Sequence, residues 1–161
     1  MIVLVMGVAG VGKTTIGEAL ASALGARFID ADDYHPPQNV AKMKAGIPLE
    51  DADRWPWLDR LNKALQEERR AVLACSALKE SYRRRLADGV PDFRIVYLHG
   101  TPELIRERMK TRRHRYMPAA LLDSQLATLE PPKDAIKIDV AAPLEESVAA
   151  IVARLPVRSS P

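Results

Sequence analysis

Directly after its first apolar run, the sequence contains the segment Gly7-Val8-Ala9-Gly10-Val11-Gly12-Lys13-Thr14, which matches the pattern G-x-x-x-x-G-K-[ST]. The run before it, Ile2 to Met6, is short and rich in β-branched residues, as is typical of a parallel strand buried on both faces. Behind it, apolar residues recur at helical spacing from Ile16 to Leu24, and Gly25 suits a left-handed helix cap. Phosphate binding by such a loop requires this order of strand, loop and helix. The segment therefore predicts an α/β fold with a phosphate site after its first strand.

Each residue type in this loop has a physical reason. Glycines let backbone N–H groups converge on phosphate oxygens, and the amino end of the following helix adds partial positive charge. Lys13 is placed to bridge the β- and γ-phosphates of ATP, and the Thr14 hydroxyl to ligate Mg²⁺. The alternative is a glycine-rich turn that matches by chance, which the flanking strand and helix disfavour. Thr15 either touches the α-phosphate or is an ordinary helix residue. We predict that the nucleotide-binding residues are Gly7, Val8, Ala9, Gly10, Val11, Gly12, Lys13, Thr14 and Thr15.

The alternation of strand and helix patterns continues along the chain. Four further apolar runs are typical of strands, at Arg27 to Asp30, Ala71 to Cys75, Arg94 to Leu98 and Ile136 to Val140. Helical stretches separate them, at about Trp57 to Arg69, at Lys79 to Leu86, after Thr101 as N-cap with Pro102 in the first position, and from Leu144 to Leu155. The pattern predicts a P-loop kinase fold with a five-stranded parallel sheet, helices on both faces and right-handed crossovers.

The length of 161 residues suits one domain and is too short for two ordinary ones, so we predict a single domain over residues 1–161. Two segments fit the alternation poorly. One spans about residues 34–56 and is rich in Pro, Lys and Asp, and the other spans about residues 110–118 and is basic. We expect both as insertions over the carboxyl edge of the sheet, where open α/β folds bind ligands.

Composition and charge exclude several classes of protein. No apolar run approaches the roughly 20 residues that span a bilayer, so we expect no membrane association and a cytoplasmic location. The single cysteine, Cys75, rules out an intramolecular disulfide. The formal charge of +3 is largely local, in a basic run from Arg106 to Arg115. Such a run is usually a solvated helix face but also suits polyphosphate, and with few aromatic residues nearby we expect no nucleic-acid partner.

Acidic residues follow the second predicted strand. If strand geometry continues, Asp30 and Asp32 project to the same side beside the phosphate loop. One carboxylate can hold the hydration shell of Mg²⁺, and the other can accept the proton of an attacking hydroxyl. We assign Asp32 to the hydroxyl and Asp30 to the metal through water, although the reverse assignment stays open. The alternative is that these are loop carboxylates that cap the next helix, which suits Asp33 better than Asp30 or Asp32. His35 is either a turn hydrogen-bonder or a substrate ligand.

Three longer motifs carry a resemblance to a known family. They are Asp30-Ala31-Asp32-Asp33-Tyr34-His35-Pro36, Asp51-Ala52-Asp53-Arg54-Trp55-Pro56-Trp57-Leu58 and Cys75-Ser76-Ala77-Leu78-Lys79-Glu80-Ser81-Tyr82-Arg83. They resemble the motifs of the gluconokinases of the small P-loop type, which are similar in fold to shikimate and adenylate kinases. The resemblance runs from Val3 through Pro132. It implies ATP-dependent phosphorylation of D-gluconate at its terminal hydroxyl to 6-phospho-D-gluconate, in a homodimer.

Basic residues in these motifs suit an anionic polyol. Lys79 and Arg83 lie four apart on a predicted helix, so we expect them on one face near the sheet edge. Together with Arg54 they could clamp a carboxylate, which arginine binds in bidentate fashion. The alternative is that the arginines are surface ion-pair partners of nearby acids, namely Asp51, Asp53 or Glu80. We predict that Asp32, His35 and Gln125 bind the hydroxyl groups.

The basic stretch from Arg108 to Met117 matches the position of a lid that closes over ATP in the family the chain resembles. Arginines of such a lid neutralise charge on the transferring phosphoryl group and exclude water. We predict that Arg108 and Arg112 bind the nucleotide and that Arg112 acts in catalysis with Lys13 and Asp32. The chain departs from the family where His114-Arg115-Tyr116 replaces Gly-His-Phe.

Two other functions remain open at this stage. One is a kinase for another small hydroxy acid such as shikimate, and the other is a non-catalytic ATP-binding module.

Overall fold

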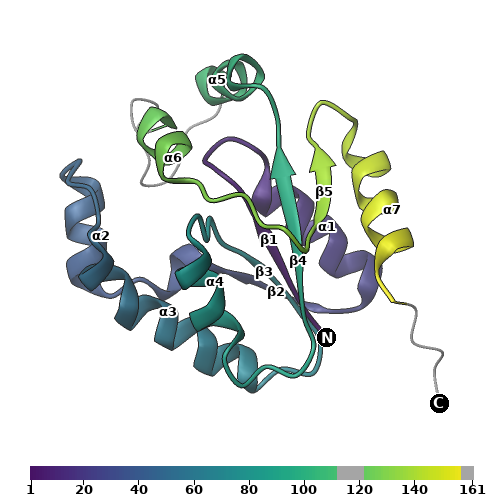
Figure 1. The fold of residues 1–161 in the computed structure, drawn as a ribbon, viewed down its shortest axis with the longest axis horizontal. Coiled ribbons are helices and arrows are strands. Elements are labelled where there is room, and N and C mark those ends of the chain that lie inside the picture. The colour runs from purple at the N-terminus through teal and green to yellow at the C-terminus, as the bar shows by residue number, and fades with distance from the viewer. Residues whose placement is uncertain (112–121, 157–161) are drawn as a thin grey trace.

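The computed structural model describes residues 1–111 and 122–156, in which five parallel strands form one sheet with the order β2-β3-β1-β4-β5 (Figure 1). The strands are β1 (Ile2–Met6), β2 (Arg27–Asp30), β3 (Ala71–Ala74), β4 (Phe93–His99) and β5 (Ile136–Asp139). Each begins and ends within one residue of its predicted bounds. The predicted five-stranded parallel sheet is confirmed.

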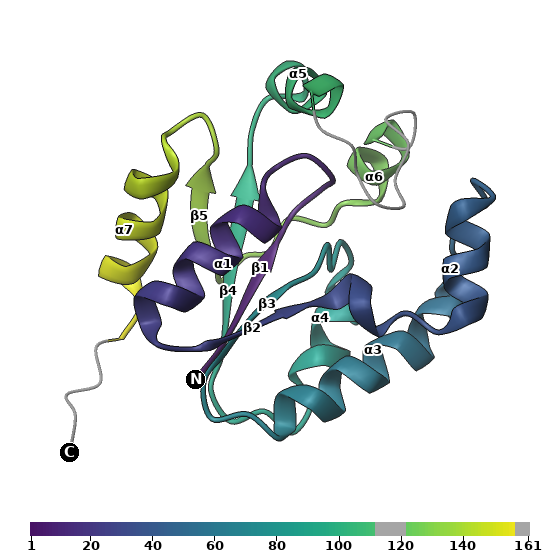
Figure 2. The same ribbon diagram turned by 180° about the vertical axis from the view of Figure 1, so that it is seen from behind.

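The central strand β1 shows why the apolar runs form this sheet. All five of its residues are buried, and successive side chains point to opposite faces. Val3 and Val5 pack into one cluster, with α1 (Lys13–Leu24) and α7 (Leu144–Arg154), and these two helices contact each other. Figure 2 shows α1 in front of the strands on this face.

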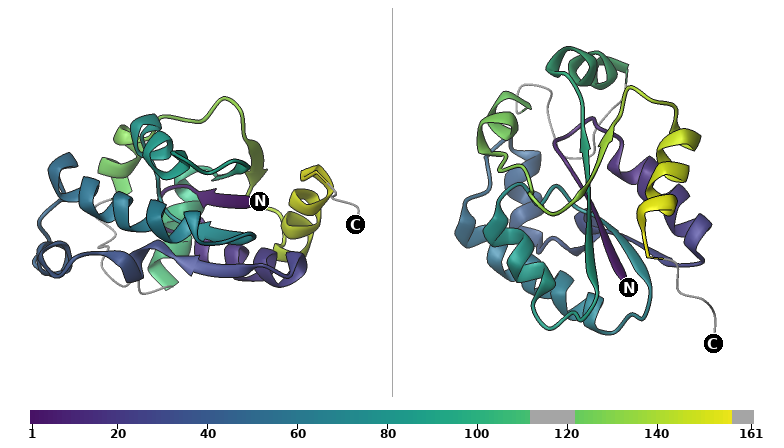
Figure 3. Two further views of the ribbon diagram at one scale, coloured as in Figure 1. Left: turned by 90° about the horizontal axis from the view of Figure 1, so that it is seen from below. Right: turned by 45° about the vertical axis from the view of Figure 1, so that its right-hand side comes forward.

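The opposite face of β1 supports a second cluster. Ile2, Leu4 and Met6 pack there with apolar residues of α3 (Asp51–Gln66) and α4 (Glu80–Ala87). Burying one apolar side chain of this size stabilises the folded state by about 1.5–3 kcal/mol. Because β1 buries such side chains on both faces, it holds the helical layers on both sides of the sheet. Figure 3 shows how the helices are arranged along the sheet. α2 (Pro37–Lys44) and α7 lie at opposite ends of the molecule.

The connections of β1 place the ligand edge. After β1 the chain passes over β3 to β2, whereas after β3 it passes over β1 to β4, so the direction of winding reverses beside β1. Ligands of open α/β sheets bind at such a point, outside the carboxyl ends of the strands. The glycine-rich loop, α5 (Pro102–Thr111) and α6 (Leu122–Thr128) lie at this end, at the top of Figure 1.

The predicted insertion at residues 34–56 is more helical than expected. A 3₁₀ turn, η1 (Ala31–Tyr34), precedes α2, and α3 begins at Asp51 rather than near Trp57. The reciprocal hydrogen bonds of a capping box between Glu50 and Asp53 start α3, and the helix continues through Pro56. Proline removes only one backbone donor, and the cap with the buried face of the helix offsets that loss.

α4, α5 and α7 lie where their sequence signals predict them, whereas α6 was not predicted. Thr101 caps α5, because its hydroxyl accepts a hydrogen bond from the Leu104 backbone N–H at 3.2 Å. Most of the predicted lid at about residues 110–118 lies outside the described residues. Within residues 1–111 and 122–156, no helix combines the length and the apolar character needed to cross a bilayer.

Candidate active site

The phosphate loop follows β1 directly and ends at the amino terminus of α1. Gly12 precedes that helix with a φ of 94°, a left-handed conformation that glycine adopts without strain. Gly7 is constrained by space as well, since a Cβ atom there would lie 2.7 Å from the Leu98 carbonyl oxygen. The loop therefore has the shape that its glycines predict, with backbone N–H groups and the helix amino end available to phosphate oxygens.

Lys13 folds back over the loop. Its Nζ donates to the carbonyl oxygens of Gly7 at 3.0 Å and Val8 at 3.1 Å. Burial lowers the pKa of Lys13, and the negative charges of Asp32 and Asp30 oppose this shift. The predicted phosphate residue and the predicted acidic pair lie at the same edge of the sheet, since the loop follows β1 and Asp30 ends β2.

The two carboxylates do not project side by side as alternating strand residues. β2 ends at Asp30, and the Oδ1 atom of Asp30 accepts the backbone N–H of Asp32 at 3.0 Å, which starts the 3₁₀ turn. The expectation of continued strand geometry is thus corrected, because Asp30 caps a turn. The Asp32 side chain is half-exposed and lines a cavity at the sheet edge.

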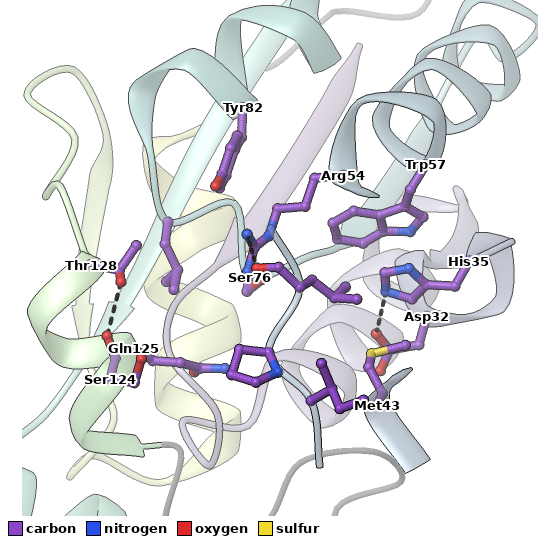
Figure 4. Close-up of a pocket in the computed structure, with 14 residues that line it drawn as sticks. Asp32, His35, Met43, Arg54, Trp57, Ser76, Tyr82, Ser124, Gln125 and Thr128 are labelled. Atoms are coloured by element: carbon purple, nitrogen blue, oxygen red, sulfur yellow. Dashed lines mark hydrogen bonds and ion pairs between the residues drawn. The ribbon is translucent and has the colours of Figure 1, made fainter. Parts of the chain in front are cut away.

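This cavity lies beside the phosphate loop and is drawn in Figure 4. Its walls come from η1 and the residue after it, the end of α2 and the segment that leads to α3, the first two turns of α3, the segment between β3 and α4 with the first turn of α4, and α6. One side is apolar, formed by Met43, Ile47, Pro48 and Leu49. The polar lining includes Asp32, His35, Arg54, Ser76, Tyr82, Ser124, Gln125 and Thr128.

His35 is held firmly in the cavity wall. Its side chain is only 3% exposed, and its ring stacks on Trp57 with centroids 4.1 Å apart. The Trp57 indole N–H donates to the Ala31 carbonyl oxygen at 2.8 Å, which fixes the tryptophan in turn. His35 Nε2 lies 3.9 Å from Asp32 Oδ1, as the dashed line in Figure 4 marks. The structure therefore brings this histidine to the cavity together with Asp32.

Arg54 lines the cavity from the first turn of α3. Its guanidinium donates to the Leu49 carbonyl oxygen at 2.7 Å and lies 3.8 Å from Asp51 Oδ1. Lys79 also pairs with Asp51, at 3.3 Å, and the Tyr82 hydroxyl donates to the same carboxylate. These hydrogen bonds, that of Tyr82 foremost, lower the pKa of Asp51. One carboxylate thus pairs with two of the three predicted cations, of which Arg54 lines the cavity and Lys79 does not.

Arg83 lies elsewhere than expected. Lys79 is the extended N-cap residue of α4 and not a helical residue, so the two cations do not share a helix face. The Arg83 guanidinium donates to the carbonyl oxygens of Ala77 at 2.7 Å and Glu130 at 2.8 Å, and the residue is 5% exposed. Among the described residues, Arg83 does not line the cavity. The Arg83 side chain instead links the segment before α4 to the segment after α6.

These contacts give a prediction for Arg83→Met. Removing the guanidinium leaves the buried Ala77 carbonyl oxygen and the partly buried Glu130 carbonyl oxygen without this donor. A buried acceptor left unpaired costs about 1–3 kcal/mol. We expect a clear loss of unfolding free energy in urea denaturation. Arg84→Met is the matched control, because that side chain is 77% exposed and its loss should change stability by less than about 0.5 kcal/mol. Unchanged stability with a raised KM for an acidic acceptor would favour the clamp role instead.

Gln125 connects the cavity to the phosphate loop. Its side-chain Oε1 accepts the backbone N–H of Ala9 at 2.7 Å, and the residue also lines the cavity from α6.

Arg108 donates to the Val140 carbonyl oxygen at the end of β5. Arg112, like His114, Arg115 and Tyr116, lies outside the described residues.

The donors present fit a magnesium ion bound with a nucleotide. Mg²⁺ keeps several waters and takes one or two protein oxygens besides phosphate oxygens, so a dedicated cluster of acidic ligands is not required. Thr14 is exposed in the first turn of α1, where its hydroxyl would hold the ion, and Asp30 would hold it through water. Within the described part of the chain, no group of three or more His, Cys, Asp or Glu could hold a metal ion by itself.

Several residues of the cavity escaped sequence reasoning. Trp57 and Tyr82 occur in the motifs quoted above, and the sequence suggests Asp51 only as a surface ion-pair partner of the arginines. Their contacts join residues at least 22 positions apart or depend on the early start of α3. Asn39 is 1% exposed and bonds to His35, and only the unpredicted helix α2 places it there. A buried asparagine between prolines and lysines gives no distinct signal in the sequence.

The chain is similar to known proteins in both sequence and fold. The family model described as "AAA domain" matches residues 2–132. The thermosensitive gluconokinase of Escherichia coli K12 is 45% identical over 145 residues, which cover 85% of this chain and 78% of that protein. The crystal structure of a gluconokinase from Sinorhizobium meliloti 1021 superposes with a TM-score of 0.86 at 46% identity, covering 94% of this chain and 89% of that one.

A more distant structure shares only the fold. Shikimate kinase from Aquifex aeolicus has a TM-score of 0.66 at 20% identity, covering 95% of both chains.

Proposed function

The chain belongs to the gluconokinase family of P-loop kinases, and from that premise we infer that it transfers the γ-phosphate of ATP to D-gluconate. The products are 6-phospho-D-gluconate and ADP. The observation that carries this function is the cavity lined by Asp32, His35 and Arg54, which the Ala9–Gln125 hydrogen bond joins to the phosphate loop. An acidic polyol in the cavity and a triphosphate on the loop would meet at that junction.

The proposed chemistry uses Asp32 as the base. The terminal hydroxyl of gluconate gives its proton to the Asp32 carboxylate as its oxygen forms a bond to the γ-phosphorus. The bond between the γ-phosphorus and the β–γ bridging oxygen breaks, and ADP leaves with that electron pair. Lys13 neutralises charge on the β- and γ-phosphates, a role that its position in the loop supports. The nine residues Gly7 to Thr15 bind the nucleotide in this proposal.

Further parts of the proposal concern groups around this centre. Mg²⁺, held by the Thr14 hydroxyl and through water by Asp30, neutralises phosphate charge when bound. Arg108 and Arg112 are proposed to approach the phosphates from the lid. We also propose a cytoplasmic homodimer with no nucleic-acid or membrane partner, in which residues 1–161 form one domain.

Arg54 is proposed to bind the substrate carboxylate, with Lys79 beside it. We expect Arg54→Met to raise the KM for gluconate roughly tenfold to a hundredfold, because a charge-assisted hydrogen bond contributes about 1.5–3 kcal/mol. The KM for ATP should stay within about twofold of wild type, as steady-state kinetics with each substrate varied will determine. Arg85→Met is the matched control, since Arg85 pairs with Asp59 on an exposed surface. An equal rise in both KM values would contradict this assignment.

The function is tested by measuring ADP release from MgATP with a panel of acceptors. D-gluconate, other aldonates, shikimate, glucose and AMP are each supplied to the purified protein. We expect strong stimulation by D-gluconate alone. Stimulation by shikimate instead would identify a kinase for another acid. ATP binding without stimulation by any acceptor would identify a non-catalytic module.

A further inference from the structure

Asn39 is a buried polar residue that the proposed reaction does not use directly. It lies in the first turn of α2 and is 1% exposed. Its side-chain Nδ2 lies 3.2 Å from Nδ1 of His35 and 2.9 Å from the backbone carbonyl oxygen of Asp53. The amide therefore bridges the histidine of the cavity and the first turn of α3.

These two contacts determine which nitrogen of His35 carries the proton. The Asp53 carbonyl oxygen can only accept, so an amide nitrogen must face it, and the reversed amide would place two acceptors together. The same nitrogen has a second hydrogen, which points to His35 Nδ1. Because Nδ1 then accepts, a neutral imidazole must carry its hydrogen on Nε2.

The ring that carries this hydrogen cannot readily turn away. It stacks on Trp57 with an interplanar angle of 15°, and Trp57 is itself bonded to Ala31. Nε2 consequently faces Asp32, which lies beside it on the same wall of the cavity (Figure 4). Their separation of 3.9 Å is too long for a direct hydrogen bond. It suits two groups that share one hydroxyl oxygen between them.

We propose that Asn39 is a positioning residue that holds His35 as the Nε2–H tautomer, so that the reacting hydroxyl is oriented toward its base. The proposal rests on the gluconate kinase function. With a hydrogen on Nε2, the imidazole donates to the hydroxyl oxygen, and the hydroxyl proton is left to point at the Asp32 carboxylate. With the opposite tautomer, Nε2 would compete with Asp32 for that proton, and fewer encounters would have the reactive geometry.

The tautomer can be observed without any substrate. Nitrogen-15 NMR of the full chain distinguishes a protonated, pyrrole-type ring nitrogen from an unprotonated, pyridine-type one. The chain has three histidines, and comparison with His35→Gln assigns the signals of His35. We expect Nδ1 to be pyridine-type and Nε2 pyrrole-type in the wild type. A pyrrole-type Nδ1 in the wild-type protein would overturn the proposal, whichever variants fold.

Two variants of Asn39 extend the test to function. Asn39→Leu removes both donors at similar volume, and Asn39→Asp offers Nδ1 only an acceptor, which favours the Nδ1–H form. In both we expect the His35 signals to move toward a pyrrole-type Nδ1. We expect kcat to fall roughly tenfold to a hundredfold, as part of the contribution of general-base catalysis, with an unchanged KM for ATP. Gln38 is an exposed neighbour of Asn39 on α2, so Gln38→Leu is the matched control. It should leave the His35 signals and kcat unchanged.

The outcomes separate this proposal from the function on which it rests. A wild-type kcat in a folded Asn39→Leu variant whose tautomer has shifted would refute the positioning role. Absence of gluconate-dependent turnover in the wild type, with His35 as Nε2–H, would instead refute the proposed function and leave the tautomer assignment intact.

Discussion

Replacing Lys13 by methionine is expected to lower kcat by at least about 10²–10³-fold, the usual effect of removing one preorganised group that stabilises transition-state charge. The ammonium group is held over the loop by the carbonyl oxygens of Gly7 and Val8, at 3.0 and 3.1 Å. Methionine keeps the length of the side chain and removes the charge. Initial rates of ADP release at saturating ATP and gluconate measure the effect.

The control for this variant is Lys63→Met, which removes an exposed lysine of α3. It should have wild-type kcat, which excludes a general effect of losing one positive charge. Thermal unfolding of both variants checks that the fold persists. Turnover of Lys13→Met close to wild type, in a folded protein, would end the assignment of Lys13 to the phosphates.

Asp32→Asn is expected to lower kcat by about 10²–10⁴-fold, because the amide cannot accept the proton of the attacking hydroxyl. The affinity for ATP should change little, since Asp32 lines the acceptor cavity rather than the loop itself. Burst or single-turnover kinetics, combined with equilibrium binding of ATP, will separate the two quantities.

The neighbouring Asp33→Asn tests the specificity of that result. Asp33 is exposed and does not line the described cavity, so its turnover should resemble that of the wild type. A further variant, Asp30→Asn, resolves the assignment that the sequence left open between Asp30 and Asp32. If Asp30→Asn abolished turnover and Asp32→Asn had no effect, the base and the metal-side carboxylate would have to be exchanged.

The strands were predictable because a strand buried on both faces has a distinct composition. β1 and β3 are apolar at every position. The helical stretches between the strands predict parallel pairing, because a helix that crosses over the sheet returns the chain in the same direction. The beginning of α3 was not predictable from the same kind of signal. The first turn of α3 lies in a segment rich in Pro, Lys and Asp, whereas the capping box of Glu50 and Asp53 starts the helix there and Trp57 is buried.

The site was predictable where local sequence determines position. The phosphate loop and Asp32 follow strand ends, so the sheet alone brings them to one edge. Arg83 was assigned to the cavity because it lies four positions after Lys79, but that spacing places two side chains on one face only within a helix, and Lys79 is the extended cap of α4. The contacts of Asn39 and Asp51 join different elements, and only tertiary packing creates them.

The most direct measurement of the central claim follows the phosphoryl group itself. Phosphorus-31 NMR is recorded while the purified protein acts on MgATP and D-gluconate. We expect one phosphomonoester to form for each ADP, with its signal split into a triplet by the two protons of the terminal carbon. Release of inorganic phosphate alone, or a doublet from an ester at a secondary hydroxyl, would contradict transfer to the terminal hydroxyl of gluconate.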